Sequence, residues 1–376
     1  MPKQTSDIFV PFGQAIAFSK SGQKWKIDKG VDVGANDPTI LSQFTDSTLV
    51  NKGYVYSYSN LAVVFTKNNA TLINKETGLI NGGVHGVFFT PEFPTGVEGS
   101  VDNYGKIFGA QAGISSTGMG DFAVENHGEI YGYEYGVYCT ASNVGSTSGP
   151  VIKNFDSIKS DEVGVYVTAF DPNLRSKVVN KKDGVIEGGK IADGYAAVRN
   201  DIGDMTLINK GKIKGDVWTP SREENTVTNT GKIKGDVRLG VGDDELDNRD
   251  GKVTGSIFGL DGKDKFIAGD ANDKFVFIGP INGTTNIDRV KNFESGKDKF
   301  FLDQAAFLGL PVGPLEKSAF RKGTEAEDGD DRIIYDQDSG KLYLDDGIDG
   351  NAPIQFAKVD PGQKLKYSDF AVDAFI

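Results

Sequence analysis

The sequence is poor in the residues on which many enzyme and metal sites depend. Its 376 residues include one cysteine, Cys139, and two histidines, His85 and His127. A single cysteine excludes an internal disulfide, so packing, backbone ladders or a metal must hold the fold together. Two histidines so far apart cannot form the His-Glu-x-x-His motif of zinc proteases. There is also no phosphate-binding loop and no nucleophile elbow, and the catalytic residues, if any, stay unassigned.

Long apolar stretches are missing as well. No run approaches the roughly 20 apolar residues of a transmembrane helix, so we expect no membrane span. The first residues are not followed by the apolar core and cleavage site of a signal peptide. The formal charge is −12, and residues 236–376 carry 28 acidic against 18 basic side chains. Such an acidic surface repels phosphates and attracts cations, so we expect no nucleic-acid partner.

The abundant feature is a repeated Asn-x-Gly phrase. Clear copies occur at 50–55, 102–107, 125–130, 208–213 and 228–233, and looser copies centre on Asn74, Asn154, Asn180 and Asn248. The phrase returns at intervals of roughly 20 to 30 residues, which is the length of one supersecondary unit. A repeat of this length cannot bury its own apolar face and stacks on its neighbours as the coils of a solenoid.

The phrase lies within strand-like alternation. In residues 207–217, apolar or small residues occupy alternate positions and lysines lie between them, which is typical of a half-buried strand. The pattern recurs with the next copies of the repeat, which matches Ile213 with Ile233 and Val253, and Val217 with Val237 and Ile257. Stacked coils place equivalent residues about 4.8 Å apart. The predicted fold is therefore all-β, a parallel β-helix with interior apolar columns and an asparagine amide ladder.

The turns of the later coils contain glycine and aspartate. Residues 239–246, 259–266 and 268–275 each carry glycine, then aspartate, then an apolar residue. They resemble the calcium-binding nonapeptide of hemolysin-type (RTX) proteins. Glycines allow carbonyls to turn inward, and calcium takes six to eight oxygen ligands. The resemblance implies calcium as the cofactor, bound in turns that contain Gly240, Gly242, Asp244, Gly259, Asp261, Gly262, Asp264, Asp270 and Asp273.

Two of these aspartates are predicted to stack on each other in successive coils. Asp244 and Asp264 occupy the same position in successive copies of the repeat. We therefore expect them one coil apart on the same edge, where their turns could sandwich one ion. Asp273 should face the opposite edge with a weaker site, because no well-formed partner turn follows it. The structural alternative is that all three turns are tight Gly-Asp turns without metal.

The C-terminal residues extend the resemblance. Residues 287–300 look like the closing β-roll strands of serralysin-type exoproteins, and 329–345 predicts a hairpin with its turn at 337–340. Residues 367–376 resemble an uncleaved signal for the type I secretion machinery. The resemblance implies an extracellular protein whose folding is driven by calcium after export. A terminal strand packed on the roll is the alternative interpretation of the tail.

These features divide the chain into four predicted regions. Residues 1–45 lack the phrase and should form an N-terminal cap, and 46–235 form the β-helix. Residues 236–278 form the RTX-like calcium-binding coils, and 279–376 form the C-terminal cap with the secretion signal.

Aromatic and lysine residues flank the central apolar position of many coils. Aromatic faces can stack on sugar rings and lysines can meet uronate carboxylates, so these residues predict a groove for an acidic polysaccharide. The residues are Tyr54, Tyr56, Phe108, Tyr131, Tyr133, Tyr135, Lys212 and Lys232. The alternative is that tyrosine simply favours strands and lysine protects exposed strand edges.

Three functions stay open. The first is a secreted calcium-binding protein that binds glycans in the matrix or at the cell surface. The second is an exopolysaccharide lyase or glycanase with its active site on the β-helix face, for which Lys106, Glu129, Tyr131 and Glu187 are candidates. The third is a structural surface-layer or adhesin component. Parallel β-helices often serve lyase chemistry, but a fold alone does not establish a function.

Overall fold

The computed structural model describes residues 1–90, 98–142, 147–171, 173–347 and 351–375. These residues form β-strands and three short 3-10 helices, η1 (Ile191–Asp193), η2 (Lys317–Ala319) and η3 (Tyr367–Asp369), and contain no α-helix. None of the described helices has the length and apolarity needed to cross a membrane. The chain divides into two compact units, Met1–Trp218 and Thr219–Ile376.

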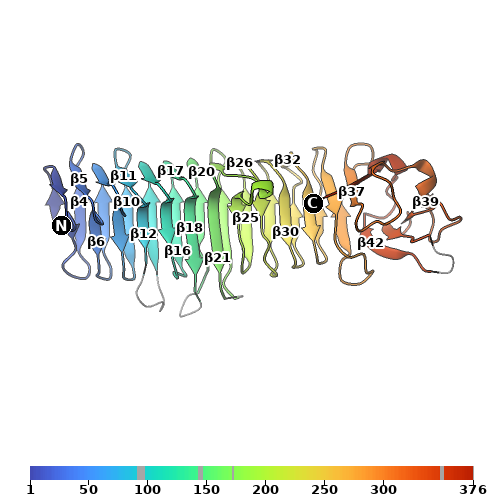
Figure 1. The fold of residues 1–376 in the computed structure, drawn as a ribbon, viewed down its shortest axis with the longest axis horizontal. Coiled ribbons are helices and arrows are strands. Elements are labelled where there is room, and N and C mark those ends of the chain that lie inside the picture. The colour runs from blue at the N-terminus through green and yellow to red at the C-terminus, as the bar shows by residue number, and fades with distance from the viewer. Residues whose placement is uncertain (91–97, 143–146, 172, 348–350, 376) are drawn as a thin grey trace. The chain divides into compact units, whose positions relative to one another are not determined.

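The first unit is a β-solenoid in which each coil contributes one strand to each of three parallel sheets. A representative coil contains β7 (Thr48–Asn51), β8 (Tyr54–Ser57) and β9 (Val63–Phe65). These strands pair in parallel with β10 (Ala70–Asn74), β11 (Leu79–Gly82) and β12 (His85–Phe89) of the next coil. Figure 1 shows this succession from blue to green. The predicted parallel β-helix is confirmed.

The three sheets, called A, B and C, continue in the same order through the first unit. Sheet A contains β1 (Lys3–Gln4), β4 (Lys24–Ile27), β7, β10, β13 (Gly99–Asn103), β16 (Phe122–Asn126), β19 (Val151–Asn154), β22 (Ser176–Asn180) and β25 (Met205–Asn209). Sheet B contains β2 (Ile8–Val10), β5 (Asp32–Ala35), β8, β11, β14 (Lys106–Gly109), β17 (Glu129–Gly132), β20 (Ser157–Ser160), β23 (Val185–Glu187) and β26 (Lys212–Lys214). Sheet C contains β3 (Ile16–Ala17), β6 (Ile40–Ser42), β9, β12, β15 (Ala112–Ser116), β18 (Tyr135–Ala141), β21 (Val163–Ala169), β24 (Ala196–Arg199) and β27 (Val217–Trp218).

Residues 1–45, expected to form a cap, contribute strands β1–β6. These strands already follow the pairing of the later coils, because β2 pairs with β5 and β5 with β8, and β3 pairs with β6 and β6 with β9. The Asn-x-Gly phrase is therefore not required for a coil strand to enter its sheet.

Interior columns stabilise the first unit. The inward residues of sheet B stack in register and are fully buried: Val55, Ile80, Ile107, Ile130, Ile158, Ile186 and Ile213. Alternate residues of β25 are buried, as the sequence pattern predicts. Each buried isoleucine removes apolar surface from water, which stabilises the fold by about 25 cal/mol for each Å² of apolar surface buried.

The second unit begins with similar coils. Its strands are β28 (Thr226–Asn229), β29 (Lys232–Lys234), β30 (Val237–Gly240), β31 (Glu245–Asp247), β32 (Lys252–Val253), β33 (Ile257–Leu260), β34 (Lys265–Ile267), β35 (Lys274–Phe277), β36 (Asp288–Lys291) and β37 (Lys299–Asp303). Ile233 pairs with Val253, and Val237 pairs with Ile257, as predicted. After β32, each coil keeps two of its three strands, since β34 pairs with β36 and β35 with β37.

The second unit ends in a mixed region. It contains β38 (Gly313–Pro314), β39 (Phe320–Lys322), β40 (Ile333–Asp336), β41 (Lys341–Leu344), β42 (Ile354–Lys358) and β43 (Phe370–Asp373). Strands β40 and β41 pair antiparallel, which confirms the predicted hairpin. The tail forms β43, which pairs in parallel with β37. Ile376, the last residue of the predicted secretion signal, lies outside the described residues.

Candidate functional site

A neutral asparagine ladder marks the turns between sheets A and B of the first unit. Each asparagine ends a sheet A strand and is fully buried, and Nδ2 of each one before the last donates to Oδ1 of the next at 2.8–2.9 Å. The series is Asn51, Asn74, Asn103, Asn126, Asn154, Asn180 and Asn209. The predicted ladder is confirmed, and each amide acts as both donor and acceptor.

In the second unit, a column of buried aspartates lies where the strands β31, β34 and β36 begin. The backbone N–H of Asn225 donates to Asp244 Oδ1 at 2.6 Å, and that of Asp244 donates to Asp264 Oδ1 at 2.9 Å. The N–H of Asp264 donates in turn to Asp288 Oδ1 at 3.1 Å. Asp244 and Asp264 therefore lie one coil apart on the same edge, as the sequence predicts.

One oxygen of each of the first two carboxylates lacks a donor. Asp244 Oδ2 and Asp264 Oδ2 are buried and have no hydrogen-bond partner among the described residues. Burial, together with the nearby charges of Asp243 and Glu224, raises the pKa of Asp244 to about 7. Burial, followed by the charge of Asp288, raises the pKa of Asp264 well above its ordinary range. The column is therefore unfavourable when ionised unless a cation or further donors approach it.

The predicted glycines line the turns of this column and allow close approaches. A Cβ at Gly259 would lie 1.9 Å from Asp264 Oδ2, and one at Gly262 would lie 2.2 Å from the carbonyl oxygen of Gly242. Gly240 likewise faces the backbone carbonyls of Thr219 and Ser221. Only glycine leaves this space beside the carboxylates and carbonyls.

The other predicted metal ligands are arranged differently. Asp261 and Asp270 are exposed. Asp273 is buried in a second column, where its Oδ1 accepts from Asn248 Nδ2 at 2.9 Å and its Oδ2 from the Gly269 N–H at 3.0 Å. Burial raises its pKa to about 6. Asp273 thus lies on a different edge from Asp244, as predicted, and donors already satisfy both of its oxygens.

Two residues in these columns were missed by sequence reasoning, Asp288 and Asp298. The N–H of Asp273 donates to Asp298 Oδ1 at 3.0 Å, so a partner turn does follow Asp273, contrary to the prediction. The Gly-x-Asp-x-Phe spacing of residues 296–300 is the signal that could have identified it. Asp288 follows a longer connection than the one that joins Asp244 to Asp264, so matching coils of equal length does not reveal it.

The described residues contain no group of three or more histidine, cysteine, aspartate or glutamate side chains close enough to hold a metal ion. An ion at the Asp244–Asp264 turns would therefore need backbone carbonyls in addition to the two carboxylates. Calcium accepts such mixed oxygen ligands. The two orphaned carboxylate oxygens and the glycine turns fit that requirement.

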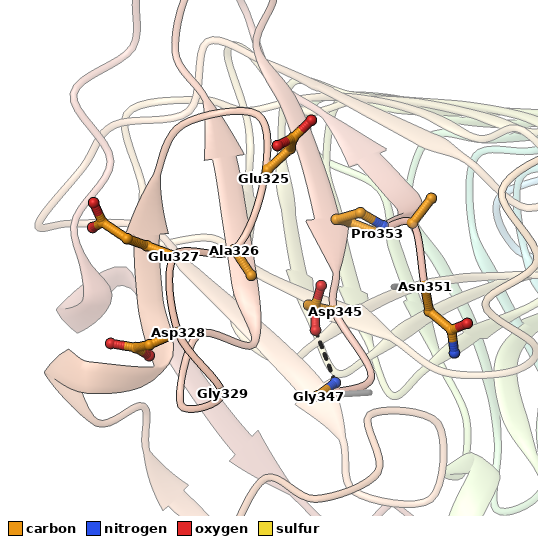
Figure 2. A pocket seen from close by; sticks show the side chains of 10 residues that line it. Glu325, Ala326, Glu327, Asp328, Gly329, Asp345, Gly347, Asn351 and Pro353 are labelled. Atoms are coloured by element: carbon orange, nitrogen blue, oxygen red, sulfur yellow. Dashed lines mark hydrogen bonds between the residues drawn. The ribbon is translucent and has the colours of Figure 1, made fainter. Parts of the chain in front are cut away.

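An acidic pocket of about 330 Å³ lies in the mixed region of the second unit. Figure 2 shows the carboxylates of Glu325, Glu327 and Asp328 pointing in different directions around it. Asp345 is buried, and its Oδ1 accepts from the Gly347 N–H at 2.8 Å. The acids of this pocket do not converge on one point.

The predicted glycan-binding residues are only partly brought together. Tyr56, Phe108 and Tyr131 occupy one outward register column of sheet B, with Asn81 between the first two. The rings of Phe108 and Tyr131 have centroids 6.4 Å apart. The other predicted residues are dispersed: Tyr54 and Lys212 lie in the neighbouring column, Tyr133 at a corner, Tyr135 at the start of β18 and Lys232 in the second unit.

The lyase candidates on sheet B are paired. Lys106 Nζ lies 3.1 Å from Glu129 Oε2, and Glu187 Oε2 lies 2.8 Å from Lys214 Nζ. Tyr131 Oη donates to Asp161 Oδ1 at 3.3 Å, and burial raises the pKa of this tyrosine. A lyase base must lose its proton near neutral pH, so this arrangement gives Tyr131 no advantage as a base.

His127 belongs to a stack of rings on the outer side of the ladder. Its ring lies between Tyr104, with centroids 4.8 Å apart, and Phe155, with centroids 4.2 Å apart. Lys75 and Lys181 cap the two ends at 5.0 and 5.4 Å from the ring centroids. The ring faces of this stack are therefore covered by one another and by the lysines.

Comparison with known proteins adds no family. No protein-family model, curated protein sequence or solved structure matches the chain.

Proposed function

We propose that the protein is a secreted, calcium-binding β-solenoid that binds an acidic glycan and whose second unit folds on calcium after export. The observation that carries the calcium proposal is the pair of buried oxygens, Asp244 Oδ2 and Asp264 Oδ2, that lack a donor. A cation bound between the two turns would satisfy both oxygens and offset the repulsion along the column.

The chemistry of the donors favours calcium over softer metals. The second unit contains neither cysteine nor histidine, because Cys139, His85 and His127 all lie in the first unit. Carboxylate and carbonyl oxygens suit calcium, which also tolerates irregular geometry better than magnesium does. An ion that binds only the folded state adds its binding free energy to stability. Low cytosolic calcium would then keep the second unit open until export.

Calcium titration of the full chain tests this proposal. We expect millimolar calcium, compared with a chelator, to raise the thermal midpoint of a β transition measured by far-ultraviolet circular dichroism. Protection of the Cys139 thiol should change little, because this buried residue reports on the first unit. Magnesium at the same concentration is the control. A midpoint that is identical with chelator and with calcium would contradict the calcium proposal.

The glycan part of the proposal rests on the first unit. Its outer faces carry aromatic rings and lysines, while Lys106, Glu129 and Glu187 are held in ion pairs. This pairing favours binding over lyase chemistry. Incubation with polygalacturonate, followed by ultraviolet absorbance of unsaturated products and by co-sedimentation, separates the two functions. We expect co-sedimentation without new absorbance; a rise in absorbance would favour the lyase.

A further inference from the structure

A groove of about 260 Å³ crosses the outer face of sheet A over β19, β22 and β25. Its floor is aliphatic, formed by Val151, Val179 and Ile208. Its rim is basic, formed by Lys153, Lys177, Lys181 and Lys210. We infer that this groove, and not the tyrosine column of sheet B, is the site that binds a uronate-bearing polysaccharide. The inference rests on the proposed glycan binding and names its site and ligand class.

The register of three neighbouring strands builds the groove. Lys153, Val179 and Ile208 are paired across β19, β22 and β25, and Val151 is paired with Lys177 in the next column outward. Lysines and aliphatic residues therefore alternate diagonally on the face. Val179 is only 7% exposed although its neighbour Val178 occupies the inward position. Lysine stems can cover apolar surface while their ammonium groups reach water, which explains this burial.

Two of the four lysines are available for an anion. Lys153 Nζ lies 3.3 Å from Glu125 Oε2, and Lys181 lies over the ring of Phe155. Lys177 and Lys210 have no ion pair with an acidic side chain among the described residues. On the sheet B face, by contrast, Lys106, Lys159 and Lys214 are each ion-paired with a glutamate. Lys177 and Lys210 thus bring unneutralised positive charge to the groove.

The spacing of these charges suits a linear polymer. Adjacent parallel strands lie about 4.8 Å apart, so a chain running across β19, β22 and β25 passes Lys177 and Lys210 on successive coils. Successive sugar carboxylates could pair with these lysines while the C–H faces of the rings contact the aliphatic floor. The ring faces of Tyr104, His127 and Phe155 are covered by one another and by lysines, so sugar rings cannot stack on them.

Other anionic polymers fit less well. A peptide that adds to a sheet needs a free strand edge, but β19, β22 and β25 are central strands whose backbone groups pair on both sides. A nucleic acid would find no aromatic ring in the lining of the groove on which its bases could stack. A polyuronate needs neither feature.

The test compares two charge-matched double variants of the full chain. Lys177→Gln with Lys210→Gln alters the groove, and Lys20→Gln with Lys29→Gln removes two exposed lysines elsewhere in the first unit. Titration calorimetry with polygalacturonate measures binding, and circular dichroism checks that both variants are folded. Because this variant loses two exposed ion pairs with the sugar carboxylates, we expect the groove variant to bind about tenfold more weakly. The control variant should bind like the natural chain.

Each other outcome has a distinct meaning. Equal weakening in both variants would indicate a net-charge effect and overturn the groove. Equal binding of polyglutamate, with the same dependence on Lys177 and Lys210, would overturn the glycan assignment. Undiminished polygalacturonate binding by the groove variant, with loss in Phe108→Ala or Tyr131→Ala, would overturn the groove while the proposed glycan function stands. Absence of polygalacturonate binding by the natural chain would overturn both the groove assignment and the proposed glycan binding.

Discussion

The asparagine ladder of the first unit and the aspartate column of the second show two ways of satisfying a buried turn. In the first unit, each amide donates to one coil and accepts from another, so the ladder is complete without charge. In the second, Asp244 and Asp264 accept a backbone N–H through one oxygen and leave the other without a donor. A carboxylate cannot donate, so the side chain of one aspartate cannot satisfy the free oxygen of the next, as an amide does in the ladder.

The change from amide to carboxylate occurs within the second unit itself. Its two columns begin with Asn225 and Asn229, and aspartates follow along both. The two columns differ, however, in how well the carboxylates are satisfied. Asp273 accepts two hydrogen bonds, whereas Asp244 and Asp264 each keep a free oxygen. The molecule therefore contains three kinds of buried turn: an asparagine ladder whose amides satisfy one another, a carboxylate with donors at both oxygens (Asp273), and two carboxylates that each lack one donor (Asp244 and Asp264).

The largest effect on stability is expected when a charged side chain replaces an amide in the asparagine ladder. Asn126 Nδ2 donates to Asn154 Oδ1 at 2.8 Å and to the carbonyl oxygens of Gly128 and Ser157 at 2.8 and 2.9 Å. Asn126→Asp would leave these acceptors without their donor and bury a negative charge among them. We expect the free energy of unfolding of the first unit to fall by about 4 kcal/mol.

The measurement for Asn126→Asp is denaturant-dependent labelling of Cys139, which is buried in the same unit. Asp156→Asn is the control, since Asp156 is exposed in the next turn. Labelling that begins at the same denaturant concentration in Asn126→Asp and the natural chain would show that the ladder contributes little.

The next effect comes from making the aspartate column resemble the asparagine ladder. Asp264→Asn keeps an oxygen to accept from the Asp244 N–H and removes a buried carboxyl group that is costly to ionise, because burial and the charge of Asp288 raise its pKa. Without calcium at pH 8, we expect the second unit to gain about 3 kcal/mol of stability. Calcium should no longer raise its melting temperature, because one of the two proposed carboxylate ligands is gone. Melting of the variant with chelator and with calcium measures both, and a retained calcium response would place the ion elsewhere.

Much of the fold followed from the sequence because the repeat is local. Alternation in residues 207–217 and the recurring asparagine were enough to predict the strands, the interior columns and the ladder. The Asp244–Asp264 stack followed in the same way from the match between two successive copies of the repeat. These features depend on spacing within one coil or between two coils of equal length.

Features that depend on unequal coils did not follow from matching successive copies of the repeat. Asp288 and Asp298 extend the two carboxylate columns, but each follows a connection longer than the one between Asp244 and Asp264. The lysine groove joins Lys153, Lys177 and Lys210 from three coils that differ in length. Only the paired register of sheet A shows that these lysines share a face.

The third effect is the pH dependence of the calcium-free second unit. The pKa of Asp244 is about 7 in the folded chain, against an ordinary value of 3.8, so the folded state binds more protons between these values. The contribution of Asp244 to stability must therefore fall as pH rises from about 4 to about 7, and this contribution is fully lost above its folded pKa. We expect a loss of about 2 kcal/mol between pH 5 and pH 8, seen as a lower melting temperature with chelator.

Calcium should reverse that slope, because it binds the ionised carboxylates and competes with protons. Melting temperatures at pH 5 and pH 8, with saturating calcium and with chelator, give the comparison directly. A calcium-free melting temperature that rises between pH 5 and pH 8 would mean that the column is not destabilised by its own ionisation.

The smallest effect is expected at the carboxylate that is already satisfied. In Asp273→Asn, the amide oxygen can still accept from Asn248 Nδ2, but the amide nitrogen then faces the Gly269 N–H, which is also a donor. Loss of that one hydrogen bond should lower the stability of the second unit by about 1 kcal/mol and leave its calcium response intact. A calcium response reduced as strongly as in Asp264→Asn would instead show that the Asp273 column also holds an ion. Because the two substitutions are chemically identical and differ only in whether the carboxylate has donors, their contrast isolates the unmet oxygen as the determinant of calcium dependence.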